Sequence, residues 1–454
     1  MVEDGQAKYQ PYPAYKPSGV MWLGDIPEEW KASKLKYETK FQVGWTPPTK
    51  TDENFVGANK WANISDLGTK TIKDTVKRIS DLAATKASMS ITPSGSLLYS
   101  FKLSVGLVSF AGEDMYTNEA IASFLPSGEI PLSYLYYALP IFVIQNASTN
   151  IYGARILNQE LIRGADIAVP PFDAAAKIAA FLDIETAKID ALIAKQQRLI
   201  SLLEEKRQAV ICHAVTKGLD PTATLRPSGI DWLGDVPAHW KVKRAKHVSN
   251  IFVPQRNKPD LNEDNGVAWA TMDDMKSKFI QETRLKVEHA SAVKSGSKVL
   301  QAGAVIASCV GNFGAASINQ IAVIINQQLQ AFIPTQIKAK YLRELVSLSK
   351  AYFEQVGTAA TLIYVNQQGF ENLPVLLPPT KEQDDICKFV GEQDTKFDAL
   401  LPKAQKAITL LKERRTALIS AAVTGKIDLR DWQPPVGKSD LCIQDSSQTE
   451  EALA

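Results

Sequence analysis

An internal repeat constrains this sequence more than any other feature. Residues 16–37 (KPSGVMWLGDIPEEWKASKLKY) return as residues 226–247 (RPSGIDWLGDVPAHWKVKRAKH), at an offset of 226 − 16 = 210 and with 11 of 22 positions identical. At an offset of 208 the register continues, and it pairs Trp61 with Trp269, Asn118 with Asn326, and Pro170-Pro171 with Pro378-Pro379. A repeat of this length predicts two copies of one structural unit.

A polar segment with an apolar stripe follows the proline pair in each copy. Its apolar residues recur at three-to-four spacing, with Lys, Glu, Gln and Arg between them, which favours an amphipathic helix. We expect one long helix at residues 172–218 and another at 380–428, paired as an antiparallel coiled coil. The residues expected to pair the helices or bind partners are Ile189, Leu192 and Leu203 in the first, and Phe397, Leu400 and Leu411 in the second.

The rest of each copy predicts a globular domain. Strand-like runs such as SLLYSF and AVIAS alternate with turn signals and with shorter helical stretches in residues 1–171 and 219–379. The expected fold class is therefore α+β, with two mixed α/β domains joined by the two helices in a pseudo-two-fold tandem repeat. Residues 429–454 are polar and acidic, and we expect a disordered tail there.

Composition excludes several classes of protein. With 51 Lys and Arg against 49 Asp and Glu, the chain does not bind nucleic acid by bulk charge, although local basic surfaces remain open. No stretch approaches the ~18 uninterrupted apolar residues of a membrane helix, and the polar N-terminus is unlike a secretory signal, so we expect an intracellular protein. The four cysteines are far apart and form no zinc-binding pattern.

Motifs that would indicate an enzyme are incomplete in this sequence. Gly425-Lys426 lacks the upstream glycine and the following Ser or Thr of a phosphate-binding loop. Residues 169–172 (VPPF) begin with Val, whereas the Asn/Asp-Pro-Pro-aromatic motif of amino-methyltransferases begins with an amide or carboxylate. The same proline pair recurs at residues 378–379, which favours a helix-entry role in both copies. We expect no catalytic residue and no metal site in this chain.

The ordered series of motifs resembles the specificity subunits of type I restriction-modification enzymes over nearly the whole chain. The matching features are the doubled PSG-x-x-WLGD-x-P-x-x-W segment, the proline pair before each long helix, and the helix ends AVTKGLD and AVTGKID. The resemblance implies that each globular domain is a target recognition domain reading one part of a split DNA sequence. The long helices would then space the two parts and dock the partner subunits.

The same resemblance implies the partners and the cellular setting. They are double-stranded DNA, two methyltransferase subunits and restriction-translocase subunits, in the cytoplasm of a prokaryote. S-adenosylmethionine, ATP and Mg²⁺ would bind those subunits, with no cofactor in this chain. The alternative is a coiled-coil interaction scaffold that does not recognise DNA sequence, and tolerance of Ala and Glu at the recognition loops would favour it.

Candidate DNA contacts fall into two groups. A basic cluster recurs in both copies and could contact phosphates: Lys70, Arg78 and Lys86, matched by Lys278, Lys286 and Lys294. Base-reading candidates follow the family pattern in three loop regions per copy, with one further residue in each. They are Thr46, Lys50, Asn63, Ser65, Ser100, Lys102 and Asn118, then Gln255, Arg256, Asn257, Thr271, Asp273, Ser308, Asn312 and Gln327. Arg256 is the strongest, because a guanidinium can contact guanine through two hydrogen bonds; any of the others could instead form turns or cap strand ends.

Overall fold

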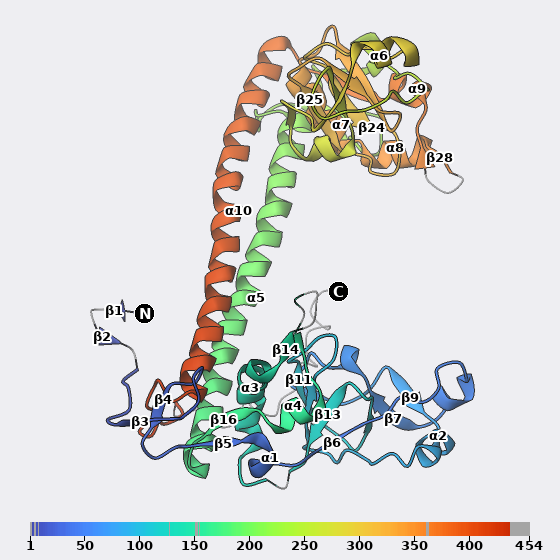
Figure 1. Cartoon of the computed structure of the whole chain (residues 1–454). Coiled ribbons are helices and arrows are strands. Elements are labelled where there is room, and N and C mark those ends of the chain that lie inside the picture. The colour runs from blue at the N-terminus through green and yellow to red at the C-terminus, as the bar shows by residue number, and fades with distance from the viewer. Residues whose placement is uncertain are drawn as a thin grey trace. The chain divides into compact units, whose positions relative to one another are not determined.

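The structure, a computed structural model, describes residues 9–126, 128–149, 153, 155–358 and 363–435, and only the backbone at 2–3, 6–7 and 359. The chain forms two units (Figure 1). Unit 1 is Met1–Gln196 with Ala407–Ala454, and unit 2 is Gln197–Lys406. Each unit holds one copy of a sheet domain, within residues 9–171 and 225–379, and parts of both long helices.

The first sheet domain is built on a five-stranded mixed sheet in the order β6-β13-β10-β11-β8. Its strands are β6 (Phe41–Val43), β8 (Thr71–Ile72), β10 (Leu97–Ser100), β11 (Val108–Ala111) and β13 (Ile121–Phe124). Alternation along β10 gives the sheet two buried faces: Leu97 and Tyr99 enter the core shared with the long helices, while Leu98 enters a second core with Ala62 and Ile121. Both faces of the sheet are therefore covered.

Smaller elements complete this domain. A three-stranded sheet has the order β12-β7-β9, and two-stranded sheets join β3 to β4, β5 to β16 and β14 to β15. The strands are β3 (Tyr15–Pro17), β4 (Asp25–Pro27), β5 (Lys31–Lys34), β7 (Asn59–Ala62), β9 (Lys77–Ile79), β12 (Tyr116–Thr117), β14 (Ser148–Thr149), β15 (Arg155–Ile156) and β16 (Asp166–Val169), and β1 (Val2–Glu3) pairs with β2 (Gln6–Ala7). The helices are α1 (Leu35–Glu38), α2 (Asp81–Lys86), α3 (Leu132–Phe142) and α4 (Gln159–Arg163), with 3-10 turns η1 (Asp52–Phe55), η2 (Ile64–Asp66) and η3 (Val143–Asn146).

The second sheet domain repeats this topology. Its five-stranded sheet has the order β20-β27-β24-β25-β22, and its three-stranded sheet has the order β23-β21-β26. The strands are β17 (Leu225–Pro227), β18 (Asp235–Pro237), β19 (Lys241–Arg244), β20 (Ser249–Phe252), β21 (Val267–Ala270), β22 (Phe279–Ile280), β23 (Leu285–Val287), β24 (Val305–Ser308), β25 (Ala316–Asn319), β26 (Val323–Ile325), β27 (Leu329–Pro334), β28 (Thr358–Ala359), β29 (Ile363–Tyr364) and β30 (Pro374–Leu377). The helices are α6 (His289–Ser295), α7 (Ala339–Leu348), α8 (Lys350–Val356) and α9 (Gln367–Glu371), with 3-10 turns η4 (Ala245–His247) and η5 (Met272–Lys276).

The two long helices are α5 (Phe172–Lys217) and α10 (Thr380–Val423). Helix α5 begins in unit 1 and α10 ends there, so their segments run antiparallel within that unit, and the same holds in unit 2 with the roles exchanged. Helix α10 continues through Pro402. The predicted α+β class, with two mixed domains and two long antiparallel helices, is confirmed.

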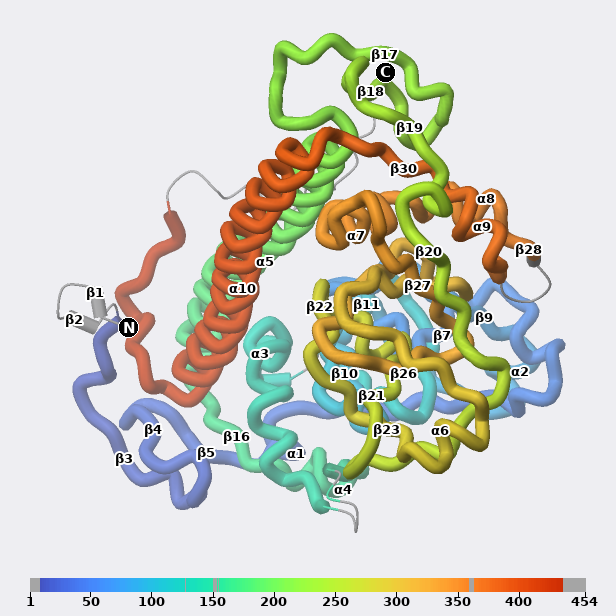
Figure 2. Tube along the Cα trace, turned by 90° about the horizontal axis from the view of Figure 1, so that it is seen from above, coloured from blue at the N-terminus to red at the C-terminus, as the bar shows by residue number. Residues whose placement is uncertain are grey.

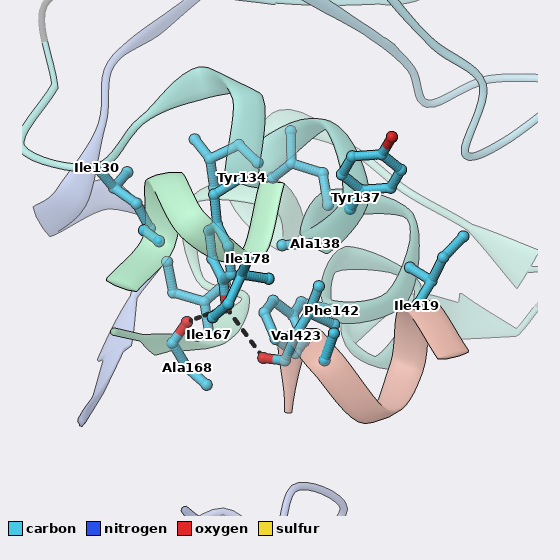
Figure 3. Packing of buried hydrophobic residues seen from close by; sticks show 14 of the residues in the cluster. Ile130, Tyr134, Tyr137, Ala138, Phe142, Ile167, Ala168, Ile178, Ile419 and Val423 are labelled. Carbon is cyan, nitrogen blue, oxygen red and sulfur yellow. Dashed lines mark hydrogen bonds between the residues drawn. The ribbon is translucent and has the colours of Figure 1, made fainter. Parts of the chain in front are cut away.

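A buried tyrosine joins each sheet domain to the end of a long helix. In unit 1 the Tyr134 hydroxyl, on α3, lies 2.9 Å from the Ala168 carbonyl oxygen and 3.0 Å from that of Val423 in the last turn of α10 (Figure 3). In unit 2 the Tyr341 hydroxyl, on α7, donates to the Val215 carbonyl of α5 at 2.9 Å. Helix ends leave carbonyls without intrahelical partners, and these tyrosines satisfy one in each unit.

Glycines and tryptophans explain the recurring helix ends. Gly218 and Gly425 have φ of 79° and 72°, which suits glycine after a helix. A Cβ at Gly425 would lie 2.4 Å from Pro27 Cδ, and one at Gly218 would lie 3.2 Å from Trp240 Cζ2. Because Trp30 and Trp240 are both buried, these tryptophans pack beneath the helix ends.

The segment after α10 lies beside the N-terminal segment within unit 1 (Figure 2). The Asp428 amide donates to the Gln10 carbonyl at 2.7 Å, and Arg430 pairs with Glu29 at 2.9 Å. Leu429 is buried, and the Trp432 ring packs edge-on against Phe181. The expectation of disorder from residue 429 is therefore wrong for residues 429–432, because their apolar side chains are packed; residues 436–454 lie outside the described residues.

Among the residues that the structure describes, no helix is long and apolar enough to cross a membrane.

Candidate nucleic-acid interface

Residues 117–120 gather three loops of the first sheet domain into one cluster, which we call loop cluster 1. The loop after β6 is held by a bond from the Trp45 amide to the Thr117 carbonyl at 2.9 Å. The end of β7 is held by one from the Asn118 amide to the Ala62 carbonyl at 3.0 Å. The loop after β10 is held by the Phe101 amide, which donates to the Ala120 carbonyl at 3.0 Å. The fold thus brings four predicted regions together: residues 46–50, 63–65, 100–102 and 118.

Residues 326–328 do the same in the second sheet domain, which forms loop cluster 2. The Asn326 amide donates to the Ala270 carbonyl, and the Cys309 amide donates to the Gln328 carbonyl. The Gln327 side-chain amide donates to the carbonyls of Gln255 and Arg256, each at 3.3 Å. The loops that follow β20, β21 and β24 therefore meet at the segment that carries Gln327.

Several candidates in these clusters are exposed. The structure leaves the Lys50, Lys102, Arg256, Asn257 and Asn312 side chains at the surface. Long cationic and amide side chains in such positions can reach phosphates and base edges. For these five residues DNA contact stays a prediction, with geometry that permits it.

Other candidates shape the loops instead. Ser100 and Ser308 are 0% and 1% exposed. Ser100 accepts the Leu107 amide at 3.0 Å, and Ser308 donates to the Val310 carbonyl at 2.9 Å. Gln255 is also buried, and its side-chain oxygen accepts the Lys298 amide. The prediction of base contact is wrong for these three residues, because their side chains face inward and hold the loops in place.

Asparagine and threonine caps recur at equivalent positions. Asn63 accepts the Ser65 amide at 2.8 Å and the Ser65 hydroxyl at 2.6 Å. Thr271 donates to the Asp274 carboxylate at 2.8 Å. Asn118 accepts the Ala120 amide at 3.1 Å. These bonds fix turn geometry, and Ser65 and Asp273 remain exposed beside the turns.

The two clusters differ in charge. Thr46 donates its hydroxyl hydrogen bond to the Glu119 carboxylate in loop cluster 1. Gln327, at the position equivalent to Glu119, is neutral, and loop cluster 2 adds the exposed Arg256. A carboxylate accepts from cytosine, whereas a guanidinium donates to guanine, so the two clusters present different chemistry to a duplex.

The basic candidates lie outside the two clusters. Lys70 pairs with Asp183 on α5 at 2.6 Å, and Lys278 pairs with Asp394 on α10. Arg78 bonds to Asp74, and Lys286 donates to the Asp264 carbonyl. Lys86 and Lys294 are exposed on the short helices α2 and α6. The ion pairs give Lys70 and Lys278 a structural role that does not favour phosphate contact by them.

Only some of the predicted helix-pairing residues are buried. Ile189 and Phe397 are 4% and 5% exposed, and Leu203 and Leu411 are half-buried. The equivalent residues Leu192 and Leu400 are 46% and 45% exposed, so the opposite helix covers them only in part, and partner binding by them stays a prediction.

Open apolar grooves run along the helices within each unit. In unit 1 a groove of about 860 Å³ is lined by Leu192, Leu410, Leu411, Leu418 and Ile427 among others. In unit 2 a groove of about 620 Å³ is lined by Val210, His213, Leu219 and Phe389 among others. Exposed apolar surface of this kind favours binding of another protein.

The sequence profile of the type I restriction modification DNA specificity domain matches residues 27–201 and, again, residues 237–409. The chain belongs to this family. Each match covers most of one sheet domain and more than half of the long helix that follows it.

Two relatives match nearly the whole chain. The MjaIX specificity subunit of a type I restriction enzyme from Methanocaldococcus jannaschii is 24% identical over 436 residues, which cover 90% of this chain and 96% of that protein. The MjaVIII specificity subunit from the same organism is 22% identical over 428 residues, with 89% and 95% covered.

Solved structures share the fold. The HsdS subunit from Thermoanaerobacter tengcongensis superposes with a TM-score of 0.53 at 16% identity, over 88% of this chain and 98% of that one. A chain from a type I R-M system, solved in work on complex assembly and conformational transition, superposes with a TM-score of 0.71 at 16% identity, over 88% and 99%.

Two exposed aromatic residues beside the loop clusters were not predicted from the sequence. Trp45 is 40% exposed next to Thr46, and its carbonyl accepts the Trp61 indole hydrogen bond at 3.0 Å. Tyr364 is 41% exposed on β29, which a bridge to Val310 places beside the loop after β24. Burial raises the pKa of Tyr364, and the nearby Arg256 guanidinium opposes that rise. Trp45 could have been predicted as a site residue because it precedes the candidate Thr46 in the sequence. Tyr364 could not, because only the pairing of its strand with Val310 brings it to the loop.

No group of three or more His, Cys, Asp or Glu side chains that could hold a metal ion occurs in the part of the chain that the structure describes.

Proposed function

We propose that this chain is the DNA-specificity subunit of a type I restriction-modification complex and reads a two-part DNA target. The observation that carries the proposal is the doubled match to the DNA specificity domain, with one loop cluster in each copy. Two similar reading domains suit a duplex, whose local two-fold symmetry presents equivalent grooves to both. Because the clusters differ at Glu119 and Gln327, the two half-sites should differ in sequence.

The long helices would space the two domains and bind the partner subunits. The grooves at equivalent places in the two units support docking of two methyltransferase subunits, and restriction-translocase subunits would join that assembly. S-adenosylmethionine, ATP and Mg²⁺ would act on those partners, and this chain would contribute no catalytic group. A subunit that reads chromosomal DNA in a prokaryote works in the cytoplasm.

Selection from random duplexes tests this proposal. The chain, co-purified with its methyltransferase partner, should enrich one sequence with two specified parts separated by a spacer of fixed length and unspecified bases. A matched complex with Arg256→Ala should enrich a sequence relaxed in one part alone. Failure of the wild-type complex to enrich any sequence would contradict DNA recognition and favour a scaffold that only joins proteins.

A further inference from the structure

In each sheet domain a lysine at the equivalent position forms an ion pair with a long helix. In unit 1, Lys70 precedes β8 and pairs with Asp183 on α5 at 2.6 Å. In unit 2, Lys278 precedes β22 and pairs with Asp394 on α10. The two lysines are equivalent at the repeat offset of 208. Their carboxylate partners are not equivalent, since Asp394 corresponds to Thr186, three residues or about one helical turn from Asp183.

Each unit also has an ion pair made by an arginine of the other long helix. Arg415 on α10 pairs with Asp190 on α5 at 2.9 Å in unit 1. Arg207 on α5 pairs with Asp398 on α10 at 2.8 Å in unit 2. Both the arginines and the aspartates are equivalent at the offset of 208. The same interhelical ion pair is therefore formed twice, with the helices exchanging roles.

Burial strengthens the network in unit 2. Asp394 is 13% exposed and binds both Lys278 and Arg207, the latter at 2.6 Å. Glu344 on α7 accepts Lys278 at 3.1 Å and Arg343 at 2.5 Å. Partly buried ion pairs are screened less by salt than exposed ones, and multiple partners fix the geometry of each charge.

In unit 1, aromatic side chains contact both members of the Lys70–Asp183 pair. The Lys70 ammonium lies 5.8 Å from the centre of the Tyr136 ring, and the Tyr137 hydroxyl donates to Asp183 at 2.5 Å. Tyr136 and Tyr137 are both on α3, which packs in the core shared with the long helices. The lysine therefore meets a site built by the helix α3 and the helix α5 together.

We infer that these two groups of four residues, which we call clamps, set the orientation of each sheet domain on its helix pair and so fix the spacer between the DNA half-sites. Clamp 1 is Lys70, Asp183, Asp190 and Arg415; clamp 2 is Lys278, Asp394, Asp398 and Arg207. The inference rests on the proposed function. The clamp residues are positioning residues: the lysine holds the sheet domain to one long helix, and the arginine holds that helix to the opposite one. In clamp 2 the lysine and the arginine share Asp394, whereas in clamp 1 the two pairs lie about two turns apart on α5.

Charge reversal and charge exchange in clamp 1 test the inference. Lys70→Glu places like charges side by side at Asp183, and we expect the assembled complex to lose affinity for its selected sequence about tenfold. Its selected pool should contain spacers shifted by one base pair beside the original spacer. The exchange variant, Lys70→Glu with Asp183→Lys, should return to a single spacer and to within about twofold of wild-type affinity. The second exchange, Asp190→Arg with Arg415→Asp, should behave as the first exchange does.

The control is Lys40→Glu, a reversal of an exposed lysine in the same sheet domain that belongs to neither loop cluster. It should keep the wild-type spacer and affinity. If Lys70→Glu proves too unstable to purify, recovery of folded protein in the exchange variant, followed by circular dichroism on melting, supports the clamp.

Two results would overturn the clamp. One is a Lys70→Glu complex that binds as wild type does; the other is lost affinity that Asp183→Lys fails to restore, which would assign Lys70 to phosphate. Both are distinct from failure of the proposed function, in which the wild-type complex itself selects no two-part sequence.

Discussion

The most informative side chain in the two loop clusters is Arg256. Its guanidinium is exposed, while its backbone carbonyl is held by Gln327, so the loop that presents it is anchored. Loss of a bidentate contact to guanine costs about 1–3 kcal/mol and relaxes reading at one position. We therefore expect Arg256→Ala to weaken binding of the specific sequence by about 5- to 150-fold, measured by titration of a labelled duplex.

Arg284→Ala is a suitable control for Arg256→Ala, because Arg284 is exposed and pairs with Glu263 outside the loop cluster. Equal weakening by Arg256→Ala on specific and random duplexes would instead make Arg256 a phosphate contact.

A second test at the residue scale concerns Tyr341. Its buried hydroxyl satisfies the Val215 carbonyl near the end of α5, and burial raises its pKa well above the ordinary value, so the hydroxyl keeps its proton at neutral pH. Tyr341→Phe leaves that carbonyl without its partner and should lower the free energy of unfolding by about 1–3 kcal/mol. Urea denaturation measures the loss. Tyr352→Phe is the matched control, since that hydroxyl bonds to Gly369 and is only half-buried; an equal loss there would contradict a special role for Tyr341.

Burial decided which residue predictions failed. The repeat located Ser100 and Ser308 correctly at the ends of equivalent strands, and their loops do join the clusters. Whether a serine at a strand end faces outward depends on the loop that follows it, and here each hydroxyl bonds to that loop.

At the scale of elements, the long helices were the most predictable feature. Apolar spacing located α5 and α10 to within a few residues, because the stripe continues through many turns. The same stripe overstated helix pairing: a broad apolar face is only partly covered by one neighbouring helix, which leaves Leu192 and Leu400 open. The lysines before β8 and β22 were read as phosphate contacts because ion pairs between distant segments leave no local pattern.

Lengthening both helices tests their role as the spacer. Four residues inserted between Gln196 and Gln197, and four between Lys406 and Ala407, add about one turn, or ~6 Å, to each. At ~3.4 Å per base pair, the unread spacer should lengthen by one or two base pairs while both half-sites stay the same. Sequencing of the methylated sites would show the longer spacer, with insertion of the same four residues after the exposed Pro435 as control. An unchanged spacer would contradict the proposal that the length of the helices sets the spacer.

For the whole molecule, the balance of 51 cations and 49 anions predicts how strongly the chain attracts DNA without regard to sequence. Lys70, Arg207 and Arg415 serve internal ion pairs and are not available to neutralise phosphates, and the remaining cations are nearly balanced by the anions of the chain. Weak non-specific attraction should follow, with a modest dependence on salt. Specific reading then has to come from the two loop clusters acting together.

The sequence predicted two domains of one fold but not the composition of the units. The repeat divides the chain into consecutive halves, whereas unit 1 contains both the first and the last segments. The reason is that the end of α10 packs in the core of unit 1, with Leu418 and Val423 buried there, and that residues 428–432 continue this packing. They contact Gln10 and Glu29 in the N-terminal segment and Phe181 on α5, and no local motif encodes these contacts.

The most direct test of the central claim is the pattern of methylated adenines in cells that contain this chain and its methyltransferase partner. Single-molecule sequencing should find adenines methylated in one two-part sequence with a constant spacer. Exchange of the residues of loop cluster 2 for those of another specificity subunit should change one part of that sequence and leave the other part and the spacer as they were. Methylation at an undivided sequence, or a change in both parts at once, would contradict reading by two independent domains.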